Sequence, residues 1–262
     1  CTSFEIKNSE FASNPATGFG GAIFSNANPK LTVDGVTFTD NKASYNANML
    51  NQSNFSPIVS STNNYSVFVY KSLFNGTLPA RYNLAENGFV TDVKNQQDSG
   101  NCWAFAALAS LETCVLKASN KTFNFSVENM KNLIEMYSAY GWKMETNEGG
   151  YNGMPMGYLA SWLGPVNATL DPFDDKGTLS PLLDSEMHIQ NIYVLPARTS
   201  YTDNDAIKEA ILKYGGLYAS YYHSAGYLNS KTNAYYDPYT GNGNHAITVV
   251  GWDDNYSKNN FI

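Results

Sequence analysis

The clearest periodic pattern lies in the middle of the chain. From Trp103 onward, apolar residues recur at the three- and four-residue spacing of one helix face: Ala104, Phe105, Ala107, Leu108, Leu111, Val115 and Leu116. Gly100 interrupts the chain before this run, and Asp98, Ser99 and Asn101 are residue types that cap helix starts. The pattern therefore predicts a helix over residues 102–117 that begins at Cys102.

Weaker patterns predict the remaining elements. We expect further helices over 126–140, 153–163 and 204–214. Runs rich in β-branched and aromatic residues predict strands over 190–196, 216–223 and 245–252. The last of these strands follows a glycine-rich turn and has His245 at its entry. Most of these helices come before the strands, although the helix over 204–214 lies between two of them, and the mixture agrees with an α+β fold.

The first fifty residues follow a different pattern. The segment 6–14 recurs as 33–41, so that Phe11 matches Phe38 and Asn14 matches Asn41 at a spacing of 27 residues. A fixed spacing of this size is typical of one coil of a repeat solenoid. We therefore expect residues 1–50 to form the end of a parallel β-helix, similar to adhesin-like surface proteins, and 51–77 to form an Asn/Ser-rich linker. The alternative is a disordered Asn/Ser-rich leader.

Cys102 is the main candidate for chemistry. At the first turn of a helix, free backbone N–H groups and the helix dipole favour the thiolate, which is the reactive form of cysteine. The same N–H groups can bind an oxyanion, and a nearby glutamine amide can supply a second donor. The alternative is that Cys102 is a small buried hydrophobe, as a free cysteine usually is. Cys114, twelve residues further on without a polar loop beside it, fits that structural role.

Several motifs together resemble the papain family of cysteine peptidases. Residues 78–96 resemble the start of the mature domain, and the family's glutamine, six positions before its cysteine, corresponds to Gln96. Residues 125–130 resemble the segment that opens the family's second helix, and 148–151 stand where the family has its glycine pair. His245 lies 143 residues after Cys102, within the roughly 130–150 expected in such enzymes. The resemblance covers residues 78–262.

The resemblance implies a papain-like fold and a set of roles. A helical half and a β half would flank a cleft, with Cys102 as nucleophile facing His245 as general base and acid. Gln96 and the Cys102 N–H would bind the oxyanion. Gly149 and Gly150, followed by Tyr151, would bind an extended polypeptide substrate through main-chain hydrogen bonds. The implied activity is hydrolysis of peptide bonds through a thioester intermediate.

The chain departs from the family pattern at two places. Ser99 stands where the family usually has a cysteine, so the disulfide that normally braces this loop is not expected. The family's third catalytic residue, an asparagine in an Asn-Ser-Trp motif, has no counterpart before Ile262. We expect that asparagine to lie beyond Ile262, in a chain truncated at both ends, and we expect this fragment alone to be less active than a longer one.

The composition of the chain limits the classes of partner and cofactor that we expect it to bind. A net charge of −7 argues against nucleic acid as a partner and leaves no basic patch for a membrane. No Cys/His cluster has metal-ligand spacing and no glycine-rich phosphate loop follows a strand, so neither a metal nor another cofactor is expected. Asn-x-Ser/Thr acceptors occur at Asn51, Asn54, Asn64, Asn75, Asn120, Asn124, Asn167 and Asn255. With the solenoid, they favour a glycosylated extracellular or cell-surface protein, with cell-wall contact through residues 1–50.

Three classes of function remain open. The first is a cysteine endopeptidase on or outside the cell surface. The second is a catalytically inert papain-like domain within an adhesin-like binding protein, although Gln96, Cys102 and His245 are all present. The third is another thiol acyl-transfer enzyme, either transglutaminase-like or a cell-wall peptide hydrolase. The spacing of Gln96 and the pair Gly149 and Gly150 favour the peptidase.

Overall fold

The structure is a computed structural model, and it describes residues 4–8, 10–12, 23–25, 31–34, 37–39, 49–51, 76–238 and 242–257. Contacts along the chain define two compact units, Cys1–Val67 and Phe68–Ile262. The predicted linker over 51–77 lies almost entirely outside the described residues. Each unit is described by itself.

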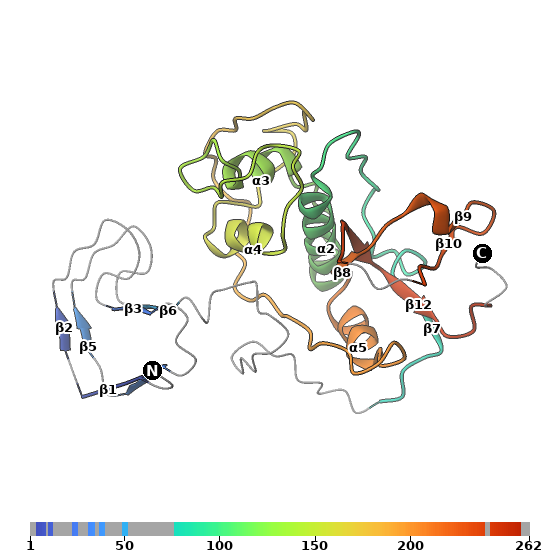
Figure 1. Cartoon of the computed structure of the whole chain (residues 1–262), viewed down its shortest axis with the longest axis horizontal. Coiled ribbons are helices and arrows are strands. Elements are labelled where there is room, and N and C mark those ends of the chain that lie inside the picture. The colour runs from blue at the N-terminus through green and yellow to red at the C-terminus, as the bar shows by residue number, and fades with distance from the viewer. Residues whose placement is uncertain are drawn as a thin grey trace. The chain divides into compact units, whose positions relative to one another are not determined.

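In the first unit, the described residues form short strands that pair in parallel (Figure 1). Strand β1 (Phe4–Lys7) pairs with β4 (Leu31–Asp34), β2 (Glu10–Ala12) with β5 (Thr37–Thr39), and β3 (Ile23–Ser25) with β6 (Met49–Asn51). Phe11 lies opposite Phe38, so the 27-residue spacing of the sequence is also the register of β2 with β5, and β1 pairs with β4 at the same spacing. Ile23 lies opposite Met49, so β3 and β6 pair at a spacing one residue shorter.

The second unit is built around helix α2 (Cys102–Ser119), which begins where the sequence predicts. It ends where Asn120 takes the left-handed conformation (φ 56°) and donates its N–H to the carbonyl of Leu116, a common way to satisfy the last turn. By length and composition alone α2 could cross a membrane. Its buried residues, however, pack against the other elements of this unit, as in the core helix of a folded domain.

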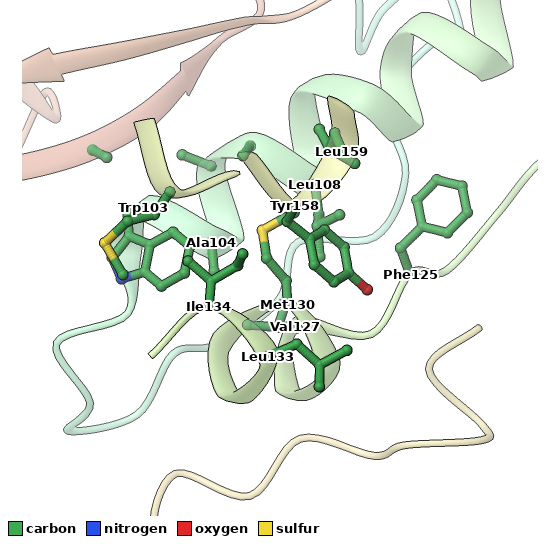
Figure 2. Close-up of a cluster of buried hydrophobic side chains, with 14 residues drawn as sticks. Trp103, Ala104, Leu108, Phe125, Val127, Met130, Leu133, Ile134, Tyr158 and Leu159 are labelled. Atoms are coloured by element: carbon green, nitrogen blue, oxygen red, sulfur yellow. The ribbon is translucent and has the colours of Figure 1, made fainter. Parts of the chain in front are cut away.

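Helices α3 (Val127–Ile134) and α4 (Gly153–Ala160) pack against α2 (Figure 1). Their shared core includes Trp103, Leu108, Met130 and Tyr158, all of which are fully buried (Figure 2). Ser126 caps α3 by accepting the N–H of Asn129, which supports the predicted helix start. The predicted length was wrong, because α3 ends at Ile134 rather than near 140.

The strands lie on the other side of α2 (Figure 1). Strand β8 (Leu217–Tyr221) pairs antiparallel with β11 (His245–Val249), and β7 (Arg81–Asn83) pairs antiparallel with β12 (Gly251–Asp253). A short hairpin of β9 (Leu228–Asn229) and β10 (Ala234–Tyr235) follows the 3₁₀ turn η1 (Ala225–Tyr227), and helix α5 (Asp205–Lys213) precedes β8. The strand predicted over 190–196 was wrong: this segment holds only an isolated bridge at Val194.

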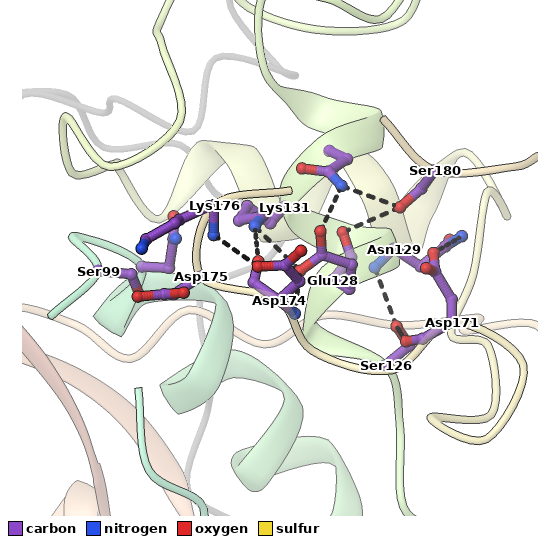
Figure 3. A network of polar contacts seen from close by, with 12 residues as sticks. Ser99, Ser126, Glu128, Asn129, Lys131, Asp171, Asp174, Asp175, Lys176 and Ser180 are labelled. Atoms are coloured by element: carbon purple, nitrogen blue, oxygen red, sulfur yellow. Dashed lines mark hydrogen bonds and ion pairs between the residues drawn. The ribbon is translucent and has the colours of Figure 1, made fainter. Parts of the chain in front are cut away.

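A buried polar network connects α3 to the loop around Asp174 (Figure 3). The side chains of Glu128 and Lys131 form an ion pair of 2.9 Å, and both are almost completely buried. Glu128 also accepts the N–H of Asp174, and Lys131 donates to the carbonyl of Asp174. Because buried charges are tolerated only when they are paired and hydrogen-bonded, these contacts hold the loop in one place.

Glu135, directly after α3, should make stability depend on pH. It is 1% exposed, and burial raises the pKa of its carboxyl from 4.5 to about 7, against smaller opposing effects of Thr146 and Lys131. Because the folded-state pKa is raised, the stabilising contribution is complete below about pH 4.5 and is lost as pH rises to about 7. We expect Glu135→Gln to remove about 3 kcal/mol of pH dependence in the free energy of unfolding across this range.

Urea unfolding of the wild type and of Glu135→Gln at pH 4.5 and pH 7.5 measures this effect. Glu145→Gln is the control, because this glutamate is exposed in the same region. Equal pH dependence of the wild type and Glu135→Gln would contradict the burial of this carboxyl.

Candidate active site

Cys102 is the first residue of α2, and its thiol is half-buried. The N–H groups of Ala104 and Phe105 both donate to the carbonyl of Asn101, which forms the first turn. In the described part of the chain, the N–H of Cys102 has no acceptor. The thiol therefore has a free backbone donor beside it at the positive end of a helix dipole, which is the arrangement that favours a thiolate and an oxyanion.

Gln96 lies in a closed turn directly before the helix. Its side-chain amide donates to the carbonyl of Ser99 at 2.8 Å, and the Ser99 hydroxyl donates back to the Gln96 carbonyl at 2.7 Å. A primary amide carries two N–H donors, so one remains for an oxyanion. Ser99, which stands where the family usually has a cysteine, thus closes this turn by hydrogen bonding.

The loop before Cys102 is also tied to the glycine segment. The amide of Asn101 donates to the side chain of Asn147 at 3.0 Å, and Asn147 donates to the carbonyl of Asp175 at 3.1 Å. Asn147 has a φ of 78°, a conformation that asparagine tolerates better than most residues. These contacts brace the loop of Cys102 without a disulfide.

The glycine pair lies beside the start of α2. Gly149 has a φ of 90°, which L-residues with a side chain rarely adopt. A methyl group on Gly150 would collide with the fully buried indole of Trp103, only 2.6 Å from its Nε1. Tyr151 follows with its side chain half-exposed, at the edge of the segment. The structure thus brings Gly149 and Gly150 next to the neighbours of Cys102.

Gly150→Ala should disturb this contact strongly. We expect a loss of stability of roughly 1–3 kcal/mol from overpacking against Trp103, and roughly a tenfold or greater fall in kcat/KM as the segment shifts. Thermal unfolding and peptide hydrolysis measure the two effects. Gly157→Ala is the matched control, because this glycine lies in α4 with no atom within 4 Å of an added methyl, and alanine there should stabilise the helix. Equal behaviour of the two variants would contradict the close approach to Trp103.

His245 is the first residue of β11, and its ring is half-buried. Thr248 of the same strand donates its hydroxyl to the carbonyl of Ala106 at 2.8 Å, which fixes β11 against the first turns of α2. Burial lowers the pKa of His245, and the nearby His223 lowers it further. Among the described contacts, no hydrogen bond joins the thiol of Cys102 to the imidazole of His245. The two residues lie on packed elements, but the structure does not show them in direct contact.

Two residues near the site had no assigned role in the sequence. Burial raises the pKa of Tyr218 on β8, which lies opposite Thr248 of the strand that begins with His245. His223 lies 5.8 Å from His245 between ring centroids. Both depend on the pairing of β8 with β11, and no local motif marks either one.

The described residues contain no group of three or more His, Cys, Asp or Glu side chains that could hold a metal ion. A shallow cavity of about 280 Å³ lies near Asn147 and is lined also by Tyr137, Glu145, Thr146, Lys176 and Thr178. It lies on the helical side and contains none of the candidate catalytic residues.

Comparison with known proteins identifies the family. The family model of the papain family cysteine proteases matches residues 78–262. The chain belongs to this family. Cathepsin S of Mus musculus is 31% identical over 193 residues, covering 70% of this chain and 53% of the relative. Cathepsin S of Bos taurus is 32% identical over 191 residues, covering 70% and 54%. The chain therefore spans about half the length of these relatives.

Solved structures agree with a papain-like α+β fold. The cysteine protease and lectin-like domains of Cwp84, a surface layer associated protein of Clostridium difficile, superpose with a TM-score of 0.63 at 27% identity, covering 73% of this chain and 42% of that one. The bromelain protease from Ananas comosus in complex with the E64 inhibitor superposes with a TM-score of 0.55 at 22% identity, covering 70% and 79%. The second likeness concerns the fold alone.

Proposed function

We propose that this chain is a cysteine endopeptidase that hydrolyses polypeptides through a thioester intermediate. The observation that carries the proposal is the place of Cys102, at the start of α2 with a free N–H, beside Gly149 and Gly150 in a papain-family chain. A thiol in this place can ionise, attack a carbonyl and find a donor for the resulting oxyanion.

The proposed reaction uses three residues. His245 takes the thiol proton of Cys102, the thiolate attacks the scissile carbonyl, and the oxyanion binds the Cys102 N–H and the free N–H of the Gln96 amide. When the C–N bond breaks, the leaving amine takes this proton from the imidazolium of His245 and a thioester remains. Water then attacks the thioester as His245 accepts its proton, the C–S bond breaks to release the acid product, and the proton returns from His245 to the sulfur of Cys102. Since no contact joins Cys102 and His245 in the described structure, we expect their hydrogen bond to form when substrate binds.

Substrate would lie in an extended conformation along the glycine segment. Gly149 and Gly150 lack side chains that could prevent close approach, so a peptide can pair with their main chain as an added strand. Tyr151 is exposed at the edge of this segment and would contact a substrate side chain. Such main-chain recognition accepts many sequences.

Labelling with a thiol-directed peptidyl epoxide tests the function. The full chain should form a single covalent adduct at Cys102, located by peptide mass mapping, and should cleave an unstructured protein substrate at internal bonds. An adduct without cleavage, but with acyl transfer to added amines, would support a transferase. Absence of an adduct in the folded chain would support the catalytically inert binding domain.

The proposal extends to the location of the protein. We infer that residues 1–50 are coils of a parallel β-helix in a protein on or outside the cell surface, which would contact the cell wall through this unit. The parallel pairs Phe4 with Leu31 and Glu10 with Thr37, both 27 residues apart, support the coils. The likeness to a surface layer associated protein supports the location. Surface biotinylation of intact producing cells should label the chain, and label confined to lysed cells would contradict this location.

A further inference from the structure

A second imidazole lies next to His245. The ring centroids of His223 and His245 are 5.8 Å apart, and their planes are inclined by 50°. In the antiparallel pairing of β8 and β11, Tyr221 lies directly opposite His245. His223 follows two residues later, so the end of β8 carries it to the entry of the neighbouring strand.

The backbone of His223 is clamped in this place. Its N–H donates to the side-chain oxygen of Asn244 at 2.6 Å, and its carbonyl accepts from the Asn244 amide at 3.0 Å. Asn244 immediately precedes His245 in the chain, so the same residue fixes the positions of both histidines. An exposed histidine without such a clamp would sample many positions relative to its neighbours.

The side chain of His223 is held as well. Its ring stacks on that of Tyr235, with centroids 5.6 Å apart and planes inclined by 24°. Its Nδ1 lies 2.9 Å from the hydroxyl of Tyr221. A phenol can donate to a neutral imidazole and accept from a protonated one, so this bond persists in both states of His223. The surroundings therefore allow His223 to gain a proton without moving.

In the described structure, the titratable side chains that contact His223 come from β8, β10 and β11. Tyr221 of β8 and Tyr235 of β10 contact His223, and His245 faces it from β11. Burial raises the pKa of Tyr221, and Tyr235 adds to that rise, so the Tyr221 phenol stays neutral at physiological pH. Of these groups beside His245, His223 is the one that can carry a positive charge. Two positive charges about 6 Å apart repel each other even when partly screened by water.

We propose that His223 is a positioning residue of this site, which acts through His245 by disfavouring a second positive charge beside it. A protonated His223 makes the imidazolium of His245 harder to form, and a neutral His223 does not. We therefore expect the protonation of each ring to depend on that of the other. The consequence for catalysis rests on the proposed function, but the coupling itself does not.

The test is an NMR titration of the imidazole rings in the full chain, which has three histidines. In the wild type, the titration curve of His245 should be broader than that of a single independent group. In His223→Gln, which keeps a polar side chain without the charge, His245 should titrate in one step, with its pKa raised by about half a unit to one unit. His188→Gln should leave the titration of His245 unchanged, because His188 stacks on Trp162 and has no contact with this pair.

The wild-type curves keep the proposal testable if His223→Gln does not fold. A wild-type curve of His245 with the shape of a single independent group would overturn it, as would an unchanged pKa of His245 in folded His223→Gln. If the chain is a peptidase, the acid limb of its kcat/KM profile should lose one ionisation in His223→Gln while the alkaline limb stays in place. A coupled titration without peptidase activity would support this inference and contradict the proposed function.

Discussion

Replacement of Cys102 by serine is expected to lower kcat/KM for peptide hydrolysis by roughly 10⁴-fold or more. The thiolate is a strong nucleophile, whereas a serine hydroxyl in the same place attacks only with the help of a general base. The described structure shows no hydrogen bond from this position to His245, so a hydroxyl would lack that base in the resting site. The peptidyl epoxide adduct should disappear in the same variant.

The chain contains its own matched control. Cys114 lies in the same helix, with its sulfur 3.9 Å from the carbonyl of Gly216, and burial raises the pKa of its thiol. A raised pKa keeps this cysteine in the unreactive thiol form. Cys114→Ser should therefore retain activity within about a factor of two, provided that it folds, and the epoxide should still label Cys102. Similar losses in both variants would mean that the activity depends on helix packing rather than on a nucleophile.

The sequence predicted those elements whose signals are local. The start of α2 at Cys102 follows from Gly100 and polar residues before an apolar face, and the start of α3 follows from the family segment at 125–130, where the structure shows Ser126 as the cap. Both depend on contacts within a few residues. They also place the nucleophile, because its position at a helix start is part of its chemistry.

Elements that depend on distant partners were missed or wrongly placed. The segment 190–196 has the apolar residues of a strand, but Tyr193 and Val194 are largely exposed and the structure gives the segment only an isolated bridge. Strand β7 has only three residues and pairs with β12, about 170 residues away. Strand formation depends on the neighbouring strand as much as on the residues themselves, and a sequence pattern does not name that neighbour.

The distinction between local signals and distant partners also applies to the residues of the site. Gln96, Gly149 and Gly150 could be assigned because their spacing matches a family motif. His223 could not, because its place beside His245 arises from the register of β8 with β11 and from the clamp by Asn244. The hydrogen bond between Asn101 and Asn147 could not be predicted from the sequence either, although both residues are next to assigned motifs. A side-chain hydrogen bond across 46 residues leaves no periodic signal.

Lys131→Met is expected to cost roughly 3–5 kcal/mol in the free energy of unfolding. The ammonium group of Lys131 is completely buried, pairs with Glu128, and lies 5.4 Å from the ring centroid of Phe173. Methionine has a similar volume, so the cost arises from the unpaired carboxylate left behind and not from a cavity. Lys143→Met should change stability by less than about 0.5 kcal/mol, because this lysine is exposed on the same half of the domain.

A double-mutant cycle with Glu128→Gln separates the charge from the packing. If the ion pair is desolvated, the two substitutions together should cost less than the sum of the single ones by at least about 1 kcal/mol. Additive effects, or a loss below about 1 kcal/mol for Lys131→Met alone, would contradict the burial of this pair. Chemical denaturation at neutral pH measures all four chains of the cycle.

We expect Lys131→Met to affect the active site as well as the stability of the fold. Lys131 donates to the carbonyl of Asp174, and the next carbonyl, that of Asp175, accepts from Asn147, whose side chain accepts from Asn101 directly before Cys102. A displaced loop at 174–175 would therefore loosen the contact that braces the nucleophile. We expect folded Lys131→Met to show a lower rate of epoxide labelling at Cys102, measured well below its unfolding midpoint, whereas Lys143→Met should label at the wild-type rate. Equal rates would show that the loop can move without disturbing Cys102, so that the network stabilises the fold but not the site.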